Sequence, residues 1–249
     1  ELLLRPAPAR PRSGAGPTAA IGAMLAGDRS KREALSVSDP ERLNKADNAL
    51  GWWNWCNLAS LLLNSIVTYL SLTGIFGPDN GELSAKYQTL LTPASWTFRI
   101  WSIIFFSETA FTIAQMFPKY RNHEAVKAIT PLFLVANAFQ ICWTPTFSRE
   151  VMWLSVMFIY GILASLSAIV ACVDGRALSW VDYAFLHAPF AVHLGWMICA
   201  AALNTNVLAD SLRARPATQL GLAVLSLAGL AVTIKGLAAE PVVRLAIAW

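Results

Sequence analysis

The feature that most constrains this chain is a series of long apolar segments after residue 50. Windows of roughly 20 residues, the length that an α-helix needs to cross a hydrocarbon core of about 30 Å, give six segments, at 53–75, 97–117, 128–147, 151–173, 181–208 and 217–238. Hydrophobic residues make up 56% of the sequence and charged residues 14%, against about 25% charged residues in soluble domains. The sequence therefore predicts an all-α integral membrane protein.

The distribution of basic residues predicts the orientation of the spans, because Lys and Arg near helix ends resist translocation. One side of the membrane would collect Arg29, Lys31, Arg32, Arg42, Lys45, Lys119, Arg121, Lys127, Arg176, Lys235 and Arg244, and the other only Lys86, Arg149, Arg213 and Arg215. Both termini are expected on the cytosolic side, or on the stromal or matrix side of an organelle membrane. The net charge of +4 then reflects topology and contact with anionic lipid, and no nucleic-acid binding is expected.

The first 50 residues differ from the rest of the chain. Residues 5–13 and the Gly/Ala stretch after them cannot build a packed core, so residues 1–50 are expected to form a basic, largely irregular tail. Its Arg/Ala/Ser-rich, acid-poor start is typical of an organellar transit region, which favours a thylakoid or mitochondrial membrane. Residues 38–41 offer the cap and proline of a short surface helix. Residues 51–208 would form a membrane bundle, and residues 209–249 an additional span and a C-terminal tail.

The sequence lacks the usual signs of an enzyme or of a metal site. No Gly-rich phosphate loop, zinc motif or nucleophile elbow occurs. The four cysteines, Cys56, Cys142, Cys172 and Cys199, form no CxxC pair and are expected to be small buried apolar residues. A transporter is disfavoured because no repeated pair of broken helices is visible. We therefore expect a non-enzymatic protein.

The ten tryptophans lie mostly near the ends of predicted spans. Indole rings favour the headgroup boundary, where an apolar body and one N–H donor are both accommodated. This structural explanation weakens where polar residues share the same helix face, as they do on three spans. Their stripes at helical spacing are Trp101, Phe105, Glu108, Thr112 and Gln115; Asn137, Gln140 and Thr144; and Pro189, His193, Trp196, Ala200 and Asn204.

These stripes are expected to turn away from lipid, because an unpaired polar group in hydrocarbon is costly. A ligand cavity and a hydrogen-bonded bundle interior both meet that need, and spacing alone leaves both open. Glu108 is a functional candidate as an ionisable residue deep in a span, or else a carboxyl group that hydrogen-bonds a neighbouring helix. A small-residue face on the fourth span predicts close packing against another helix of the bundle or a second subunit: Gly161, Ala164, Ser165 and Ala168.

Two histidines mark the fifth predicted span. His187 and His193 are six residues apart and so lie on different helix faces, which argues against a shared metal site. Either could act singly as the axial ligand of a tetrapyrrole metal. A lone histidine in a membrane is more often a hydrogen-bonding group between helices.

Three segments resemble, in order and spacing, the TspO/MBR (translocator protein, tryptophan-rich sensory protein) family. Residues 92–105, TPASWTFRIWSIIF, are similar to its loop-to-helix motif, and residues 137–143, NAFQICW, to the Asn-to-Trp pattern of its third helix. Residues 188–204, from APF through Trp196 to Asn204, resemble the pattern of its fifth helix. The likeness covers residues 50–208 and is that of a divergent member. Arg99 stands where a small residue is usual, the loop 77–95 is long, and the tail and the sixth span are additions.

The resemblance implies a TspO-like five-helix bundle, here with a sixth transmembrane helix. Its cavity, beneath the first loop, would receive porphyrins, sterol-like molecules or other planar apolar compounds, since indole faces stack on flat rings and Asn amides satisfy their few polar atoms. Some relatives have been proposed to degrade porphyrin in light, but nothing else in this chain supports catalysis. The candidate ligand-binding residues, from the matching positions and the stripes together, are Trp96, Trp101, Glu108, Asn137, Trp143, His193, Trp196 and Asn204.

The leading prediction is a non-enzymatic membrane protein that binds a tetrapyrrole or another apolar planar ligand in a Trp-rich cavity. The alternative is an accessory scaffold subunit of a large organellar complex, such as a photosystem or respiratory complex, that holds chlorophyll or carotenoid at its surface. The basic tail, the sixth span and the small-residue face favour that alternative. The expected partners are membrane lipids, a hydrophobic small molecule, and either a second copy of the chain or the subunits of a larger complex.

Overall fold

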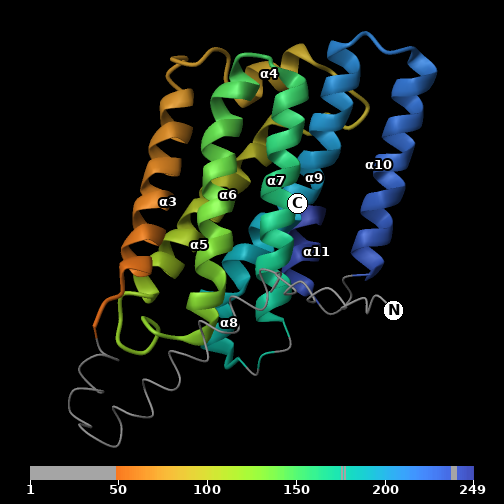
Figure 1. Cartoon of the computed structure of the whole chain (residues 1–249). Coiled ribbons are helices and arrows are strands. Elements are labelled where there is room, and N and C mark those ends of the chain that lie inside the picture. The colour runs from red at the N-terminus through yellow and green to blue at the C-terminus, as the bar shows by residue number, and fades with distance from the viewer. Residues whose placement is uncertain (1–48, 175, 177, 237–239) are drawn as a thin grey trace, which may run out of the picture. The chain divides into compact units, whose positions relative to one another are not determined.

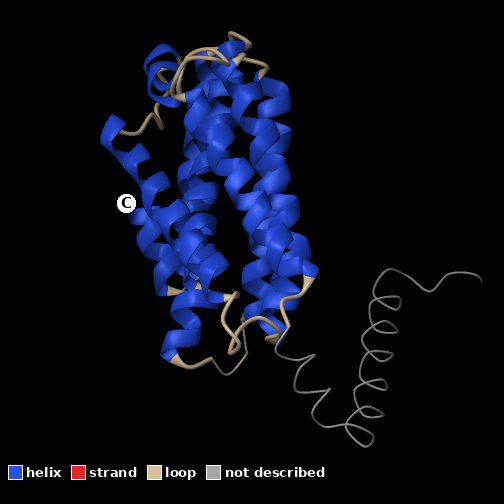
Figure 2. Cartoon of the chain, turned by 90° about the vertical axis from the view of Figure 1, so that its left-hand side faces the viewer, coloured by secondary structure: helices blue, strands red, loops and turns tan. Residues whose placement is uncertain are grey.

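The computed structural model describes residues 49–249 except residues 175, 177 and 237–239. Every regular element in this part of the chain is a helix (Figure 2), which confirms the predicted all-α class. The predicted tail and its surface helix at 38–41 lie outside the described residues.

Four helices are long and apolar enough to cross a membrane. They are α6 (Glu124–Ser148), α7 (Met152–Val173), α9 (Ala188–Ser211) and α10 (Pro216–Gly236). The last of these is the predicted sixth span. These helices run alternately up and down, so that the start of α9 and the end of α10 lie at the same end of the bundle (Figure 1).

Two predicted spans do not meet the same criteria of length and hydropathy. Helix α3 (Trp52–Ser71) lies alongside α6 (Figure 1), but three buried asparagines make it less apolar. Helix α5 (Ile100–Ala114) has 15 residues, which extend about 22 Å and so fall short of a full hydrocarbon core. The chain before α5 enters the bundle through the 3₁₀ helix η1 (Ser95–Arg99). The six predicted spans are thus four long apolar helices, one polar-faced helix and one short helix.

The fifth predicted span, 181–208, is broken near its start. Helix α8 (Trp180–Leu186) ends at His187, and α9 begins directly after it with a proline in its first turn. Proline lacks a backbone N–H and suits the first turn of a helix, where no intrahelical acceptor exists. The sequence pattern predicts one continuous span here, because both helices are apolar.

The long first loop is a structured cover, which we call the lid and define as residues 77–99. It contains α4 (Asn80–Lys86), whose start is fixed by a capping box. The Asp79 carboxylate accepts from the Glu82 N–H, and the Glu82 carboxylate accepts from the Asp79 N–H, both at 2.9 Å. At Gly77, φ is +133° and a Cβ would lie 2.5 Å from the Ser148 carbonyl oxygen. Only glycine lets the lid approach the end of α6 so closely.

A polar contact holds the lid to the turn between α6 and α7. The Lys86 Nζ lies 2.5 Å from the Glu150 carboxylate, and the Tyr87 hydroxyl donates to the same carboxylate. The Lys86 ammonium, and after it the Tyr87 hydroxyl, holds the pKa of Glu150 below its usual range. A second ion pair, between Lys119 and Asp182 at 2.5 Å, lies at the other end of the bundle.

Small residues allow close helix packing at two places. A Cβ at Gly161 of α7 would lie 2.8 Å from the Phe139 ring of α6, so at this position the predicted small-residue face packs within the chain. A Cβ at Gly195 of α9 would lie 2.5 Å from the Ala246 Cβ of the last helix, α11 (Pro241–Ala248). The prediction that the four cysteines are buried is wrong. Cys142 is exposed and the others are partly exposed, because each lies outside the polar stripes that point inward.

Candidate functional site

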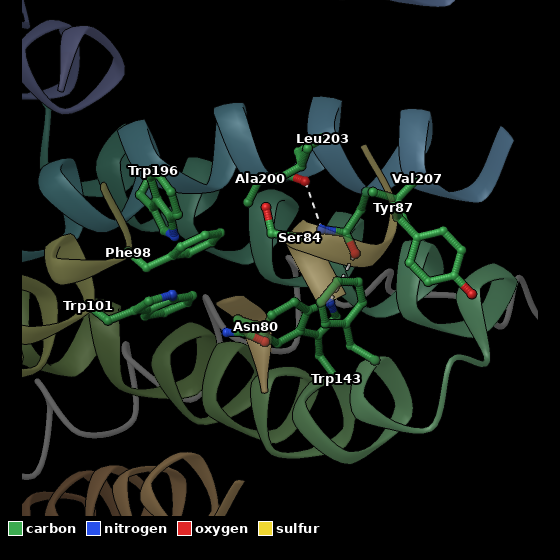
Figure 3. A pocket seen from close by; sticks show the side chains of 12 residues that line it. Asn80, Ser84, Tyr87, Phe98, Trp101, Trp143, Trp196, Ala200, Leu203 and Val207 are labelled. Atoms are coloured by element: carbon green, nitrogen blue, oxygen red, sulfur yellow. Dashed lines mark hydrogen bonds between the residues drawn. The ribbon is translucent and has the colours of Figure 1, made fainter. Parts of the chain in front are cut away.

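The three predicted stripes turn inward, and aromatic residues from two of them meet beneath the lid. Trp101 of α5, Trp143 of α6 and Trp196 of α9 surround a small pocket together with Phe98 of η1 (Figure 3). The lid covers it with residues of α4 and the segment after it. The full lining is Asn80, Ser84, Tyr87, Phe98, Trp101, Trp143, Phe147, Trp196, Ala200, Leu203, Asn204 and Val207. We call this space the aromatic pocket.

The rings of the aromatic pocket pack against one another in a fixed geometry. Trp101 lies at its centre, with its ring centroid 6.3 Å from that of Trp143 at 30° and 6.3 Å from that of Trp196 at 82°. Phe98 meets Trp196 edge to face at 6.0 Å. These separations are those of favourable aromatic pairs, so the pocket presents several ring faces in a defined arrangement.

Asn204 organises this pocket through three hydrogen bonds within the chain. Its Oδ1 accepts from the Trp143 Nε1 at 3.3 Å and from the Ser155 hydroxyl at 3.0 Å, and its Nδ2 donates to the Ala200 carbonyl at 2.9 Å. Asn204 therefore fixes the Trp143 ring. It lines the pocket as predicted, but its Oδ1 and one of its two Nδ2 N–H groups already have partners within the chain.

The indole N–H of Trp196, in contrast, is buried without a hydrogen-bond partner in the described part of the chain. The side chain is only 6% exposed, and its Nε1 finds no hydrogen-bond partner among the described residues. In Figure 3 the nitrogen points from α9 toward Phe98 and the pocket. A buried donor without an acceptor costs about 1–3 kcal/mol. It marks a position where a ligand atom that accepts a hydrogen bond would be stabilised.

The aromatic pocket is nearly closed in this structure. Its cavity volume is about 30 Å³, which leaves room for a few water molecules. Pockets that hold drug-sized ligands measure about 300–1,000 Å³. A large ligand can enter only if the lid and the ring cluster separate.

Glu108 and His193 form a buried pair behind the aromatic pocket. The Glu108 Oε1 lies 2.7 Å from the His193 Nδ1, and the two residues are 1% and 2% exposed. The Trp101 ring meets the His193 ring edge to face at 5.8 Å. Neither residue lines the pocket. Glu108 thus has the second of its two predicted roles, a carboxyl group that hydrogen-bonds a neighbouring helix.

His187 lies apart, at the junction of α8 and α9. Its ring stacks on Tyr183 with centroids 4.7 Å apart, and its Nε2 lies 3.8 Å from the Glu240 carboxylate. Neither His187 nor His193 faces the aromatic pocket. The structure therefore offers a ring bound there no axial histidine.

Asn137 belongs to a different buried region, between α3 and α6. We call this region the polar seam, and its members are Asn54, Asn57, Asn64, Gln115, Thr130 and Asn137. The Asn64 Nδ2 donates to the Asn137 Oδ1 at 2.8 Å, and the Asn57 Nδ2 donates to the Gln115 Oε1 at 2.8 Å and to the Thr130 hydroxyl at 2.9 Å. The sequence analysis missed the α3 members, although their spacing at 54, 57 and 64 places them on one helix face. Asn137 does not line the aromatic pocket.

Trp96 also lies outside the aromatic pocket. It is 52% exposed and packs edge to face on Trp249, with centroids 5.6 Å apart. Of the eight candidate ligand-binding residues, four line the pocket: Trp101, Trp143, Trp196 and Asn204. The residues that the sequence analysis missed are mainly those of the lid and the ring of Phe147. The capping-box residues Asp79 and Glu82 were the local sequence signal for α4.

A family model described as TSPO-like protein matches residues 54–249. No curated protein and no solved structure matches the chain. The family match runs through α10 and α11 and so extends beyond residues 50–208, over which the sequence resemblance was drawn. With almost four-fifths of a helical membrane protein matched, including the aromatic cluster and the lid above it, the chain belongs to the TSPO-like family.

Proposed function

We propose that this protein is a non-enzymatic membrane receptor that binds a flat, apolar ring compound, such as a tetrapyrrole, in the aromatic pocket. The observation that carries the proposal is the unpartnered N–H of Trp196, buried among the faces of Phe98 and Trp101. Flat ring faces gain dispersion and stacking energy from the indoles. One acceptor atom on the ligand would satisfy the Trp196 donor.

Ligand binding requires the lid to open, since the closed pocket has room for only a few waters. The lid is attached at its outer edge by the exposed contact of Lys86 and Tyr87 with Glu150. Exposed ion pairs of this kind are weak, because solvent screens the two charges. This attachment is suited to a cover that closes over a ligand and releases it.

The chemistry of the pocket fits a metal-free porphyrin better than a ligand that needs an axial histidine. Neither histidine lines this pocket: His193 lies behind it, where its Nδ1 bonds Glu108, and His187 lies at the α8–α9 junction. The Asn204 Oδ1 already accepts from Trp143 and Ser155, and one of its two Nδ2 N–H groups donates to Ala200. Recognition would therefore rest on ring stacking and on the Trp196 donor.

The test is a titration of the detergent-purified protein with protoporphyrin, followed by tryptophan quenching and by the shift of the Soret band. Trp196→Phe keeps an aromatic ring but removes the donor, so we expect affinity to fall by about tenfold. The matched control is Trp153→Phe, since Trp153 is 60% exposed and does not line the pocket. Equal affinity of all three proteins would contradict the assignment of Trp196, and a Soret band that never shifts would contradict porphyrin binding itself.

One observation favours a second function, that of an accessory subunit in a larger membrane complex. Helix α10 is hardly covered by the rest of the chain, with Leu225 70% and Val232 69% exposed. At Gly221 and Gly229 an added Cβ would meet nothing within 4 Å. This surface could dock on a neighbouring helix that carries chlorophyll or carotenoid. Comigration with a large pigmented complex on a native gel would support it, and a small colourless particle from the native thylakoid or mitochondrial membrane would exclude it.

A further inference from the structure

A second apolar space shares a wall with the aromatic pocket. It is a groove of about 380 Å³ between lid residues 91–97 and the helices α9, α10 and α11. Trp196, Ala200 and Leu203 of α9 line both spaces. Leu227 and Leu230 of α10 form part of the opposite wall. We call this space the lateral groove.

The lateral groove lies at the depth of the bilayer hydrocarbon. Two helices form walls of the groove at similar depth. Measured from the start of each helix, residues 199–203 of α9 and residues 227–230 of α10 lie about 16–23 Å along the helix axis. Both helices are long and apolar enough to span a membrane. The groove therefore lies near the middle of two spans, away from the headgroups.

The groove is closed on one side and open on the other. Helix α11 packs tightly on α9, where a Cβ at Gly195 would lie 2.5 Å from the Ala246 Cβ. The Trp249 Nε1 joins α11 to the lid by donating to the Thr97 carbonyl at 3.1 Å. On the α10 side, by contrast, Leu227 is 54% exposed although it lines the groove. The opening thus faces the surroundings of α10, which in a membrane are lipid chains.

We propose that the lateral groove is a binding site for one hydrocarbon chain of a membrane lipid. Its side chains are apolar or aromatic except for Thr97 and Cys199, and the Thr97 carbonyl already accepts a hydrogen bond from Trp249. Water gains too few partners in such a space, and an empty space forfeits dispersion contacts along its walls. Lipid chains surround α10 at this depth and can enter sideways. This site does not depend on the ligand proposed for the aromatic pocket.

The test uses the full chain in nanodiscs of phosphatidylcholine that carries a diazirine in the middle of one acyl chain. After illumination, labelled peptides are identified by mass spectrometry. We expect labels on the groove wall of α9, at residues 199–203, and on Ile247 of α11. Leu227→Trp fills the groove and should lower these labels by about tenfold. The matched control is Leu225→Trp, since Leu225 is 70% exposed on the same helix but does not line the groove.

Three results would overturn the proposal. The first is a wild-type protein labelled only on outward-facing residues of α10, with none on Ile247. The second is labelling of the groove wall that Leu227→Trp leaves unchanged. The third is a second copy of the chain, or a pigment, cross-linked to the groove in place of lipid. Because the wild-type labelling pattern decides the first and third outcomes, the proposal stays testable even if Leu227→Trp does not fold. Porphyrin is absent from this experiment, so its result is independent of the proposed function.

Discussion

The polar seam and the aromatic pocket are both buried, yet they differ in whether their side-chain N–H donors find acceptors. In the seam, the side-chain amide nitrogens of Asn57, Asn64 and Asn137 each donate a hydrogen bond to a protein oxygen. The side-chain carbonyl oxygens of Asn57 and Asn64 have no partner among the described residues. In the pocket, the Trp196 N–H has no acceptor among the described residues. The difference teaches that a polar residue on an inward helix face has a structural role where its partners are supplied by a neighbouring helix. It becomes a candidate for binding where they are not.

The largest effect is expected from removing the buried pair that lies between the two regions. Glu108 lies on α5 between Trp101 of the pocket and Gln115 of the seam, and it bonds His193 of α9. Glu108→Ala leaves His193 buried without its partner, so we expect a loss of about 3 kcal/mol in the free energy of unfolding. Equilibrium unfolding in mixed micelles measures it. Glu108→Gln, which keeps a hydrogen bond to His193, should recover most of the loss, and a Glu108→Ala protein as stable as the wild type would contradict the structural role.

A substitution in the seam alone should lower stability by a smaller amount and leave ligand binding unchanged. Asn57→Ala removes a donor to both Gln115 and Thr130, and we expect a loss of about 2 kcal/mol in the free energy of unfolding. Porphyrin affinity should stay within about twofold, because the seam lies outside the pocket. Leu63→Ala, on the exposed face of the same helix, is the control for shortening a side chain in α3. A large fall in affinity with unchanged stability would show that the two regions are not distinct.

The smallest expected effect concerns the lid and is kinetic. Glu150→Gln weakens the contact with Lys86, so porphyrin should associate severalfold faster in stopped-flow quenching. Low pH should do the same. The lowered pKa of Glu150 means that the contact is fully present above the usual pKa of about 4.3 and is lost as pH falls through the lower value in the folded protein. Asp182→Asn is the control, because Lys119 likewise lowers the pKa of Asp182 but this pair is at the other end of the bundle. Equal rates in the two variants would contradict a lid role.

The sequence predicts the helical membrane class and the inward stripes well, because both depend on local periodicity. Trp101, Trp143, Trp196 and Asn204 meet as the resemblance implies. What the sequence could not resolve is which inward residues find partners. Asn137 and Asn204 look alike in pattern, yet one bonds Asn64 of α3 and the other holds Trp143.

Other differences have the same physical origin. The break at His187 and the short α5 depend on how segments pack on their neighbours, and their hydropathy gives no sign of either. The lid was visible only as a long loop, because its attachment to Glu150 joins residues more than 60 positions apart. Contacts of this range carry no local signal in a single sequence.

The most direct test of the central claim is a nuclear magnetic resonance spectrum of the indole N–H groups in protein labelled with ¹⁵N at tryptophan. The Trp196 signal is assigned as the one missing in Trp196→Phe. On titration with protoporphyrin, we predict that this signal moves downfield as the N–H gains an acceptor, while the Trp153 signal stays in place. A Trp196 signal that does not move at saturating porphyrin would contradict the account.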